Sequence, residues 1–417
     1  MKKGLFFTVF TLFFTVLITA QTFQLTSEIR PRFENRHGYK TLMYSGDEGA
    51  SFISQRTRLN FNFQQEKLML GISLQNIRVW GDVSTLTSND NANSFHQAWA
   101  KYQFTDKFSL KFGRQEIVYD DSRIFGNVGW AQQARSFDAV VAQIKTSEKG
   151  ELDIGYSLNN DSEQLINSLY TNVAGYKTFQ YAWYHTEINK FGLSFLILNN
   201  GVEFLNSNLE EELNYSQTFG SRATYSVGKF SLDGAIYFQT GKILDNSVFA
   251  NYFGGNIGYK VFNEFQLRIG VEYLSGKDMN DMSNKVKSFN PIFGTNHKFN
   301  GFMDYFYVGN HMNSVGLLDL NTTIAYAKNR FSAKIIPHLF SSTAAIYNGS
   351  SKLSNNLGIE VDIALGYKFS KNVTLNAGFS KMFGTSSLEF LKGGNRSTDN
   401  SWTWLMITFT PKLFASN

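Results

Sequence analysis

The chain has 417 residues, no cysteine and a formal net charge of +5 at pH 7, which together exclude a disulfide framework, a thiolate metal site and a lipid-modified cysteine. Aromatic residues make up 16% of the chain but prolines number only 4, which favours many uninterrupted strands with aromatic ends. The positive charge is not gathered into lysine runs or a basic amphipathic helix, so nucleic acid is not expected as a partner.

Residues 1–20 predict a secretory signal peptide. Two lysines near the start are followed by the apolar run Leu5–Ile18 and by Ala20, a small residue at the expected cleavage point. The apolar run is shorter than the ~20 residues that a membrane-spanning helix needs, and no later stretch reaches that length. We expect one domain over residues 21–417, because no linker or change of composition divides them.

Polar and apolar residues alternate from Thr22 onward. The even positions from Gln24 to Arg36 are all polar or charged, whereas Phe23 and Phe33 lie at odd positions. This period of two is that of a strand with one polar and one apolar face. Similar runs recur along the chain and predict eighteen strands. The runs lie at about 22–36, 56–64, 67–80, 93–105, 107–118, 135–146, 150–160, 175–187, 190–201, 215–227, 229–241, 248–262, 264–275, 313–328, 330–342, 356–369, 372–384 and 399–411.

Three residues do not fit regular strands. Arg78 falls on the apolar parity of its run, which predicts either a bulge or a strand that rises above the membrane at that point. Pro31 and Pro337 each remove a hydrogen-bond donor from a sheet, so we expect a local bulge or a missing bond at each.

The connections between the runs alternate in length. Tight turns ending in phenylalanine lie at 105–108, 188–191, 227–230, 262–265 and 328–331, and most contain Asn, Asp or Gly, which suit short hairpins. Longer connections lie at roughly 37–51, 81–92, 119–134, 161–174, 202–214, 276–312, 343–355 and 385–398, with a shorter one at 242–247.

This alternation predicts a transmembrane β-barrel. A bilayer offers no water to unpaired backbone groups, so a spanning sheet must close on itself, and an even strand count places both termini on one side. We expect an all-β fold, an antiparallel barrel of about 18 strands with short periplasmic turns and long extracellular loops. It would lie in the outer membrane of a Gram-negative bacterium, in contact with outer-membrane lipid. A soluble β-sandwich would not normally repeat a polar face over eighteen runs.

The stretch Lys107–Ala139 indicates where the barrel is constricted. A strand pattern over its first residues is followed by a polar, glycine-bearing connection from Asp120 to Gly129, and then by another strand-like run from Arg135. A charged loop between two strands that carry charge on the non-lipid side is a natural place for a constriction.

Arginine is concentrated on the parity that faces the lumen. Guanidinium groups keep their charge and bind carboxylates through two parallel hydrogen bonds, so a lumen lined with them would favour an anion. The competing interpretation is that these arginines pair with acids across strands and hold the shape of the barrel. The candidate lumen residues are Arg30, Arg32, Glu34, Arg36, Arg56, Arg58, Arg114, Glu116, Arg123, Arg135, Asp138 and Arg268.

Signals for catalysis are weak. The six histidines are scattered and no pair has metal-ligand spacing, so we expect no metal, no cofactor and no enzyme. A Ser-His pair on a barrel wall remains open, as does calcium binding by Asp120 and Asp121, for which a solvated turn is the simpler interpretation.

Several short blocks occur together in the first third of the chain. They are RPRFENR from Arg30, QRTRL from Gln55, RVWGD from Arg78, GRQE from Gly113 and RSFDA from Arg135, with Tyr119, Arg123, Gly126, Asn127 and Trp130 between the last two. With these blocks the chain resembles the alginate export family of outer-membrane barrels. The resemblance implies a monomeric eighteen-stranded channel whose arginine-rich lumen selects acidic polysaccharide and whose loops or turns gate it. It implies as lumen residues Arg30, Arg32, Arg56, Arg58, Arg114, Arg123 and Arg135.

We therefore expect a monomeric outer-membrane porin for passive passage of a hydrophilic, anionic solute such as a uronate-rich saccharide. A second hypothesis is a structural or adhesive barrel that is closed by its loops and displays residues 276–312 outward. A third is an outer-membrane hydrolase. A receptor for energised uptake is disfavoured, because no plug domain is expected before the first strand.

Overall fold

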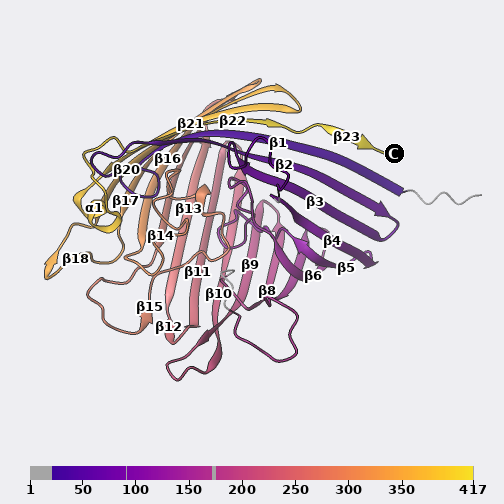
Figure 1. The fold of residues 1–417 in the computed structure, drawn as a ribbon, viewed down its shortest axis with the longest axis horizontal. Helices are drawn as coiled ribbons and strands as arrows, with labels where there is room; N and C mark the ends of the chain where they lie inside the picture. Colours follow the sequence, from indigo (N-terminus) through magenta and orange to yellow (C-terminus); the bar gives the residue numbers. More distant parts are fainter. Residues whose placement is uncertain (1–20, 91, 171–174, 417) are drawn as a thin grey trace, which may run out of the picture.

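The computed structural model describes residues 21–90, 92–170 and 175–416, and the expected signal peptide lies outside them (Figure 1). Eighteen long strands form a closed antiparallel barrel, because each strand pairs with its neighbours and β1 (Gln21–His37) also pairs with β22 (Ser401–Phe409). The other barrel strands are β2 (Ala50–Gln65), β3 (Leu68–Val79), β4 (Asn93–Thr105), β5 (Phe108–Gln115), β6 (Phe137–Lys145), β7 (Gly150–Leu158), β8 (Thr178–Ile188), β9 (Phe191–Leu205), β10 (Glu211–Val227), β11 (Phe230–Ile243), β13 (Ala250–Lys260), β14 (Phe265–Leu274), β16 (Leu317–Lys328), β17 (Phe331–Ser341), β20 (Asn356–Ser370) and β21 (Val373–Gly384).

Short elements lie outside this barrel set. They are β12 (Asn246–Val248), β15 (Lys285–Val286), β18 (Tyr347–Asn348), β19 (Ser351–Lys352), β23 (Lys412–Ala415), the 3-10 helix η1 (Asn296–Lys298) and the helix α1 (Ser386–Lys392). β23 continues the closing edge, because it pairs with the start of β1. No helix in the described part of the chain has the length and apolar character needed to cross a membrane.

The predicted parity is confirmed in β1. Ile29 and Phe33 are exposed on the outer face, where lipid would cover them, whereas Arg30, Arg32 and Glu34 are buried on the inner face. The same division into an apolar outer face and a more polar inner face holds along the barrel, because successive strand residues point to opposite faces of a sheet.

The alternation of short and long connections is confirmed, with one correction. Asn189, Gly228 and Asn329 have positive φ in three of the tight turns, as short hairpins require. The expected long connection at 202–214 is wrong, because β9 and β10 extend to Leu205 and Glu211 and pair almost to the tip. Both ends of the described part of the barrel, Gln21 and Ser416, lie at its turn end, where the backbone N–H of Ser416 donates to the carbonyl of Phe23 at 2.9 Å.

The two strand prolines interrupt the sheet on one side each. β1 pairs with β2 through Pro31 without a shift of register, but it has no partner in β22 at Arg30 and Pro31. β17 likewise has no partner in β16 at Ile336 and Pro337, although it pairs with β20 there. A missing bond, rather than a bulge, therefore accommodates each proline.

The bulge that Arg78 predicted in its own strand is not there. β3 pairs with β2 in unbroken register, and the shift lies between β3 and β4, where His96 is the extra residue of β4. Arg78 keeps the outward parity near the loop end of β3, where its guanidinium contacts Asp90.

Large aromatic side chains on the inner wall lie flat over glycines of the neighbouring strand. A Cβ added at Gly71 would come within 2.3 Å of the Trp99 ring, and one at Gly378 would come within 2.2 Å of Trp404. The glycines therefore give bulky residues space on the concave face of the barrel.

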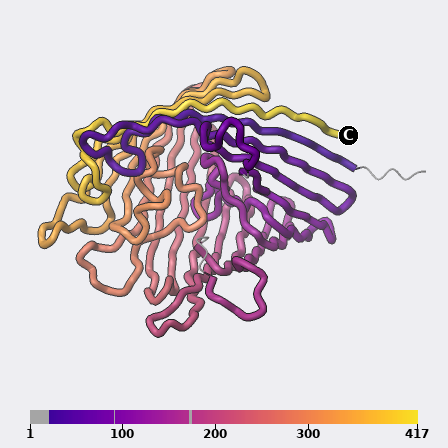
Figure 2. The backbone as a smooth tube through the Cα atoms, in the orientation of Figure 1, coloured from indigo at the N-terminus to yellow at the C-terminus, as the bar shows by residue number. Residues whose placement is uncertain are grey.

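Two of the long connections fold into the barrel (Figure 2), and their apolar side chains join inward strand residues in one buried core. We call residues 116–136 the first inward loop and residues 275–316 the second inward loop. Phe125 of the first forms a parallel bridge with Phe293 of the second, and both side chains are buried. The expectation that residues 276–312 are displayed outward is therefore wrong, because much of that segment is buried inside the barrel.

Candidate functional site

Arginines of β1 hold the backbone of the first inward loop. Nη1 of Arg30 donates to the carbonyl of Gly129 at 2.9 Å, and Nη1 of Arg32 donates to the carbonyl of Trp130 at 2.6 Å. Nη2 of Arg30 also donates to Oε1 of Gln132 at 2.9 Å. Both arginines face inward, as their parity predicted, but they are only 7% and 4% exposed because the loop covers them.

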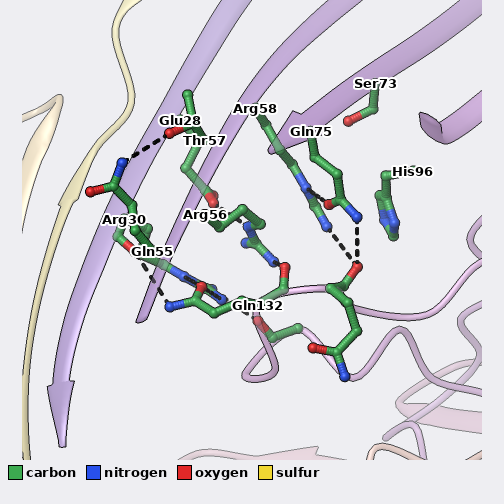
Figure 3. Close-up of polar contacts among 12 residues, drawn as sticks. Glu28, Arg30, Gln55, Arg56, Thr57, Arg58, Ser73, Gln75, His96 and Gln132 are labelled. Atoms are coloured by element: carbon green, nitrogen blue, oxygen red, sulfur yellow. Dashed lines mark hydrogen bonds and ion pairs between the residues drawn. The ribbon is translucent and has the colours of Figure 1, made fainter. Parts of the chain in front are cut away.

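Neighbouring strands continue this arrangement (Figure 3). Nη1 of Arg56 donates to the carbonyl of Gln132 at 3.2 Å, while Arg58 and Gln75 both donate to the carbonyl of Gln133, at 3.4 and 3.2 Å. The inner wall of β1–β3 therefore satisfies carbonyl groups that a loop inside a barrel would otherwise leave without donors. We call this the donor wall.

Acids on the same wall neutralise part of its charge. Oε1 of Glu28 lies 2.6 Å from Nε of Arg56, and the carboxylate of Glu34 lies 2.9 Å from both Arg32 and Arg36. Glu34 is fully buried and also accepts a hydrogen bond from the indole of Trp402. Arg56 thus pairs with an acid across strands, as the competing interpretation expected, whereas Arg32 and Arg36 pair with Glu34 of their own strand.

The remaining loop arginines join the two inward loops. Arg123 is fully buried against the carboxylate of Glu272, and its guanidinium carbon lies 3.9 Å from the ring centroid of Phe299. Burial alone would lower the pKa of Arg123, but Glu272 raises it above its usual value. Nη1 of Arg135 donates to the carbonyl of Gly294 at 3.1 Å. Burial lowers the pKa of Arg135 to about 10, so it remains a cation at neutral pH.

Two candidates do not face the lumen. Arg114 and Asp138 lie on the outward parity of β5 and β6 and form a two-pronged ion pair, with N–O distances of 3.0 and 2.7 Å. Both side chains are exposed on the outer wall. Their expected role in the lumen is therefore wrong, because Arg114 shares its parity with Phe112, which is also exposed.

Glu116 and Arg268 lie on the inner side. Glu116 accepts from Nδ2 of Asn127 at 2.9 Å and lies 2.7 Å from Nε2 of His96, so it braces the start of the first inward loop. Arg268 is paired with Asp233 at 2.6 Å, but its side chain is still 41% exposed to the interior space.

A second wall, which we call the acceptor wall, holds the second inward loop. The carboxylates of Glu360 and Asp362 accept from the backbone N–H groups of Met303 and Phe302 at 2.8 and 3.1 Å. Both acids are fully buried. Beside them, Nδ1 of His338 lies 2.9 Å from Asp319. The inner wall at β1–β3 thus supplies donors to loop carbonyls, while the inner wall at β20 supplies acceptors to loop N–H groups.

A stack of side chains runs from β1 to β17 inside the barrel and packs against Trp402 and Trp404 of β22. The guanidinium carbon of Arg32 lies 4.0 Å from the Trp130 ring centroid, and Trp130 stacks on His297 at 4.8 Å. His297 stacks in turn on Phe302 at 5.9 Å, and Nζ of Lys334 lies 4.7 Å from the centroid of Phe302. We call these five residues the aromatic stack; it couples both inward loops to both walls.

The structure also brings a serine next to a histidine. Oγ of Ser194 lies 2.9 Å from Nδ1 of His185, but it donates its proton to Asp120 at 2.5 Å. The serine proton is therefore directed at a carboxylate of the first inward loop rather than at a histidine base, and the contact anchors that loop. Within the described ranges, no group of three or more His, Asp or Glu side chains is placed to hold a metal.

Sequence reasoning missed several inward cations. Lys101 and Lys111 are register partners on β4 and β5, and Nζ of Lys111 lies 4.2 Å from the Trp99 centroid. Lys298 of the second inward loop and Lys334 of β17 line one cavity with Arg268. Among residues that the structure describes, these four lysines and Arg58 take part in no ion pair. The inward parity of the strand lysines is visible in the sequence, but only arginines were named there as candidate lumen cations.

A closed barrel of eighteen strands, with an apolar outer face and long loops that narrow a charged lumen, has the fold of an outer-membrane porin. It belongs in the outer membrane of a Gram-negative bacterium. The alginate export family model matches residues 53–384, so the chain belongs to the alginate export family, as the short sequence blocks indicated.

Solved structures support the same fold. The chain is similar to Pseudomonas aeruginosa OccK11 (OpdR), with 13% identity, a TM-score of 0.61, and 94% of this chain and 96% of that one covered. It is also similar to Pseudomonas aeruginosa OpdK, whose structure contains vanillate (12% identity, TM-score 0.59, coverage 94% and 98%). A BenF-like porin from Pseudomonas fluorescens Pf-5 is 14% identical (TM-score 0.60, coverage 94% and 99%). No curated protein matches the sequence.

Proposed function

We propose that this porin is a monomeric channel for passive passage of a hydrophilic, anionic solute such as a uronate-rich saccharide. The observation that supports this most directly is the unequal exposure of charge inside the barrel. The inward acids Glu34, Glu360 and Asp362 are fully buried under the loops, whereas Lys101 and Lys111 stay partly exposed and have no acid partner among the described residues.

This distribution suits weak, repeated binding. An anion that enters the lumen loses part of its hydration, which cations along the wall replace, while nearby acids keep any single site from holding it too tightly. The field inside a low-dielectric wall is also less screened by salt than the field at an exposed surface.

The candidate residues then divide by role. Arg30, Arg32, Arg56, Arg123 and Arg135 hold the inward loops and so set the width of the passage. Arg58 and Arg268, together with the missed lysines, are the groups that contact the solute. No catalytic step is part of this proposal.

Planar-bilayer recording across a gradient of potassium chloride tests the proposal. We expect a reversal potential that shows preference for chloride, and block of the current by added oligouronates but not by neutral oligosaccharides. Changing Lys101 and Lys111 together to Gln should reduce the anion preference, whereas Lys352→Gln, in the exposed hairpin of β18 and β19, is the matched control. An unchanged reversal potential in the double variant would contradict the assigned pathway.

One observation favours a second candidate, a barrel closed by its own loops. Both inward loops pack into a common apolar core, so the interior is well filled on the loop side. A closed structural barrel predicts a silent membrane even when the protein is shown to be folded, and current from the unmodified chain excludes it.

A further inference from the structure

The acceptor side of the barrel contains a cavity that is lined by several cations. The cavity has a volume of about 520 Å³ and is bounded by β10–β17 and by the second inward loop. Its lining extends from Glu272 and Asp319 toward the turn end, because Arg268 and Lys334 are each only a few residues from their turns. We call it the turn-side chamber.

Four cations line the turn-side chamber, and their partners leave them available. Nζ of Lys298 donates to a backbone carbonyl, that of Asp121, at 2.7 Å. Nζ of Lys334 faces the Phe302 ring at 4.7 Å and makes no hydrogen bond within the described part of the chain. An ammonium over an aromatic ring keeps its three donors, so Lys334 can still bind an oxyanion.

The other two cations share one acid. Nη2 of Arg222 lies 3.3 Å from Oδ1 of Asp233, and Nη2 of Arg268 lies 2.6 Å from Oδ2 of the same residue. Arg222 is also 3.3 Å from Asp121. Glu272 and Asp319 also line the chamber, but they are paired with Arg123 and His338. Arg222, Arg268, Lys298 and Lys334 therefore share only the carboxylates of Asp121 and Asp233, which leaves positive charge that a ligand carboxylate would balance.

Uncharged hydrogen-bonding groups complete the lining. Asn256, Gln266, Asn321 and Thr323 are inward residues of three adjacent strands, and each can both donate and accept. A simple carboxylate would leave most of them unmatched, whereas a ligand that also carries several hydroxyl groups would satisfy them. Ligand cavities of this size commonly hold a single small molecule.

An adjoining cavity adds aromatic surface. It has a volume of about 530 Å³, shares Lys298, Phe302 and Lys334 with the turn-side chamber, and is lined on its other side by Trp402 and Trp404. Nε1 of Trp404 is buried without a hydrogen-bond partner in the described structure. Apolar ring faces beside amide and hydroxyl groups suit the mixed surface of a sugar ring.

We propose that the turn-side chamber is a binding site for one acidic sugar unit. The carboxylate would be bound by Lys334 with Lys298 or Arg268, and the hydroxyl groups by the Asn, Gln and Thr side chains. This inference rests on the proposed function and deepens it, because it places a saturable site on the acceptor side and not at the donor wall, whose guanidinium groups mostly bind the loop.

Isothermal titration of the folded, detergent-solubilised barrel tests the proposal. Sodium glucuronate, glucose and sodium acetate are titrated at constant ionic strength. We expect saturable binding of glucuronate alone, because glucose lacks the charge and acetate lacks the hydroxyl groups. Equal binding of acetate and glucuronate would show a general anion effect and overturn the proposal.

Variants assign the binding to the chamber. Lys334→Gln should weaken glucuronate binding at least tenfold, a loss that corresponds to about 1.4 kcal/mol. Lys334→Arg should retain most of the affinity, and Lys352→Gln should leave it unchanged. Asn321→Leu keeps every charge and should bring the affinity for glucuronate close to that for acetate. Folding of each variant is checked by the heat-dependent gel mobility of barrels. If Lys334→Gln does not fold, Asn321→Leu serves as the test variant. Unchanged affinity in folded Lys334→Gln, or in Asn321→Leu, would overturn the site.

The same protein in a planar bilayer separates the two proposals. Anion preference without glucuronate binding would overturn the turn-side chamber as a site and leave the channel function standing. Glucuronate binding to a barrel that passes no current would support the site and overturn the channel function.

Discussion

The guanidinium of Arg32 lies over the ring of Trp130, with 4.0 Å between its central carbon and the ring centroid, and Nη1 of Arg32 also donates to the Trp130 carbonyl at 2.6 Å. One strand residue thus binds both the side chain and the backbone of the same loop residue. Because Trp130 also stacks on His297, the position of the first inward loop depends on the second. The two loops therefore behave as one obstruction across the lumen.

Removing the central ring of the stack should widen the channel. Trp130→Ala deletes contacts to Arg32 and His297, and a single aromatic or cation–π contact of this kind contributes roughly 0.5–2 kcal/mol. We expect a larger mean single-channel conductance and more frequent transitions between levels. Trp80→Ala, at an exposed outer position, is the control. Identical current traces for Trp130→Ala and the unmodified protein would show that the stack does not restrict passage.

Loss of a donor-wall arginine should loosen the first inward loop. Arg30→Gln leaves the carbonyl of Gly129 without its donor, at a cost of about 1–3 kcal/mol for an unsatisfied group inside the barrel, while the Trp130 carbonyl keeps the hydrogen bond from Arg32. Hydrogen–deuterium exchange should become faster in residues 116–136 and stay unchanged in the barrel strands. The matched control is Arg330→Gln at a turn. If exchange is unchanged while anion preference falls, Arg30 contacts the solute and does not hold the loop.

Acid should loosen the second inward loop through His311. Burial lowers the pKa of His311 to about 3, and its Nε2 lies 3.0 Å from the carbonyl of Gly316. The unfolded segment binds a proton below pH 6.5 but the folded one does not, so the contribution to stability is complete above pH 6.5 and decreases as pH falls. At pH 4.5 the loss is about 1–2 kcal/mol, allowing for partial exposure of the ring.

A single cysteine can report this loosening, because the chain has none of its own. Ser288 is 1% exposed in the second inward loop, so Ser288→Cys should react with a disulfide reagent only when the loop opens. At pH 4.5 we expect faster labelling with His311 present than with His311→Gln, and equal rates at pH 7.5. Equal labelling rates with His311 and with His311→Gln at both pH values would show that His311 does not cause the loosening of the loop.

The outer ion pair should matter little for conduction. Arg114→Gln breaks a pair whose side chains are about half exposed, and such pairs typically contribute less than about 1 kcal/mol. Reversal potential and conductance should match those of the unmodified protein. A changed anion preference would place Arg114 in the solute pathway in spite of its outward parity.

Parity in the sequence could have placed Arg114 correctly. Phe108, Leu110 and Phe112 mark the outward face of that run, and Arg114 is the next residue on it. Its position among family-specific residues suggested the lumen instead. Lys101 and Lys111 are the opposite case. Their parity places them on the inward face, but they were not named as candidate lumen residues.

The sequence by itself determined the number of strands, their two faces and the order of short and long connections. These follow from local rules, since a strand alternates every two residues and a bilayer requires every spanning backbone group to be paired. Only the tertiary structure decided where the long loops go. The bonds from Arg30 to Gly129 and from Met303 to Glu360 join residues far apart in the chain, and no periodic pattern encodes them. They form because the closed barrel surrounds the loops with its inner wall, so that strands far from a loop in sequence lie beside it in space, and this closure decides which cations hold a loop.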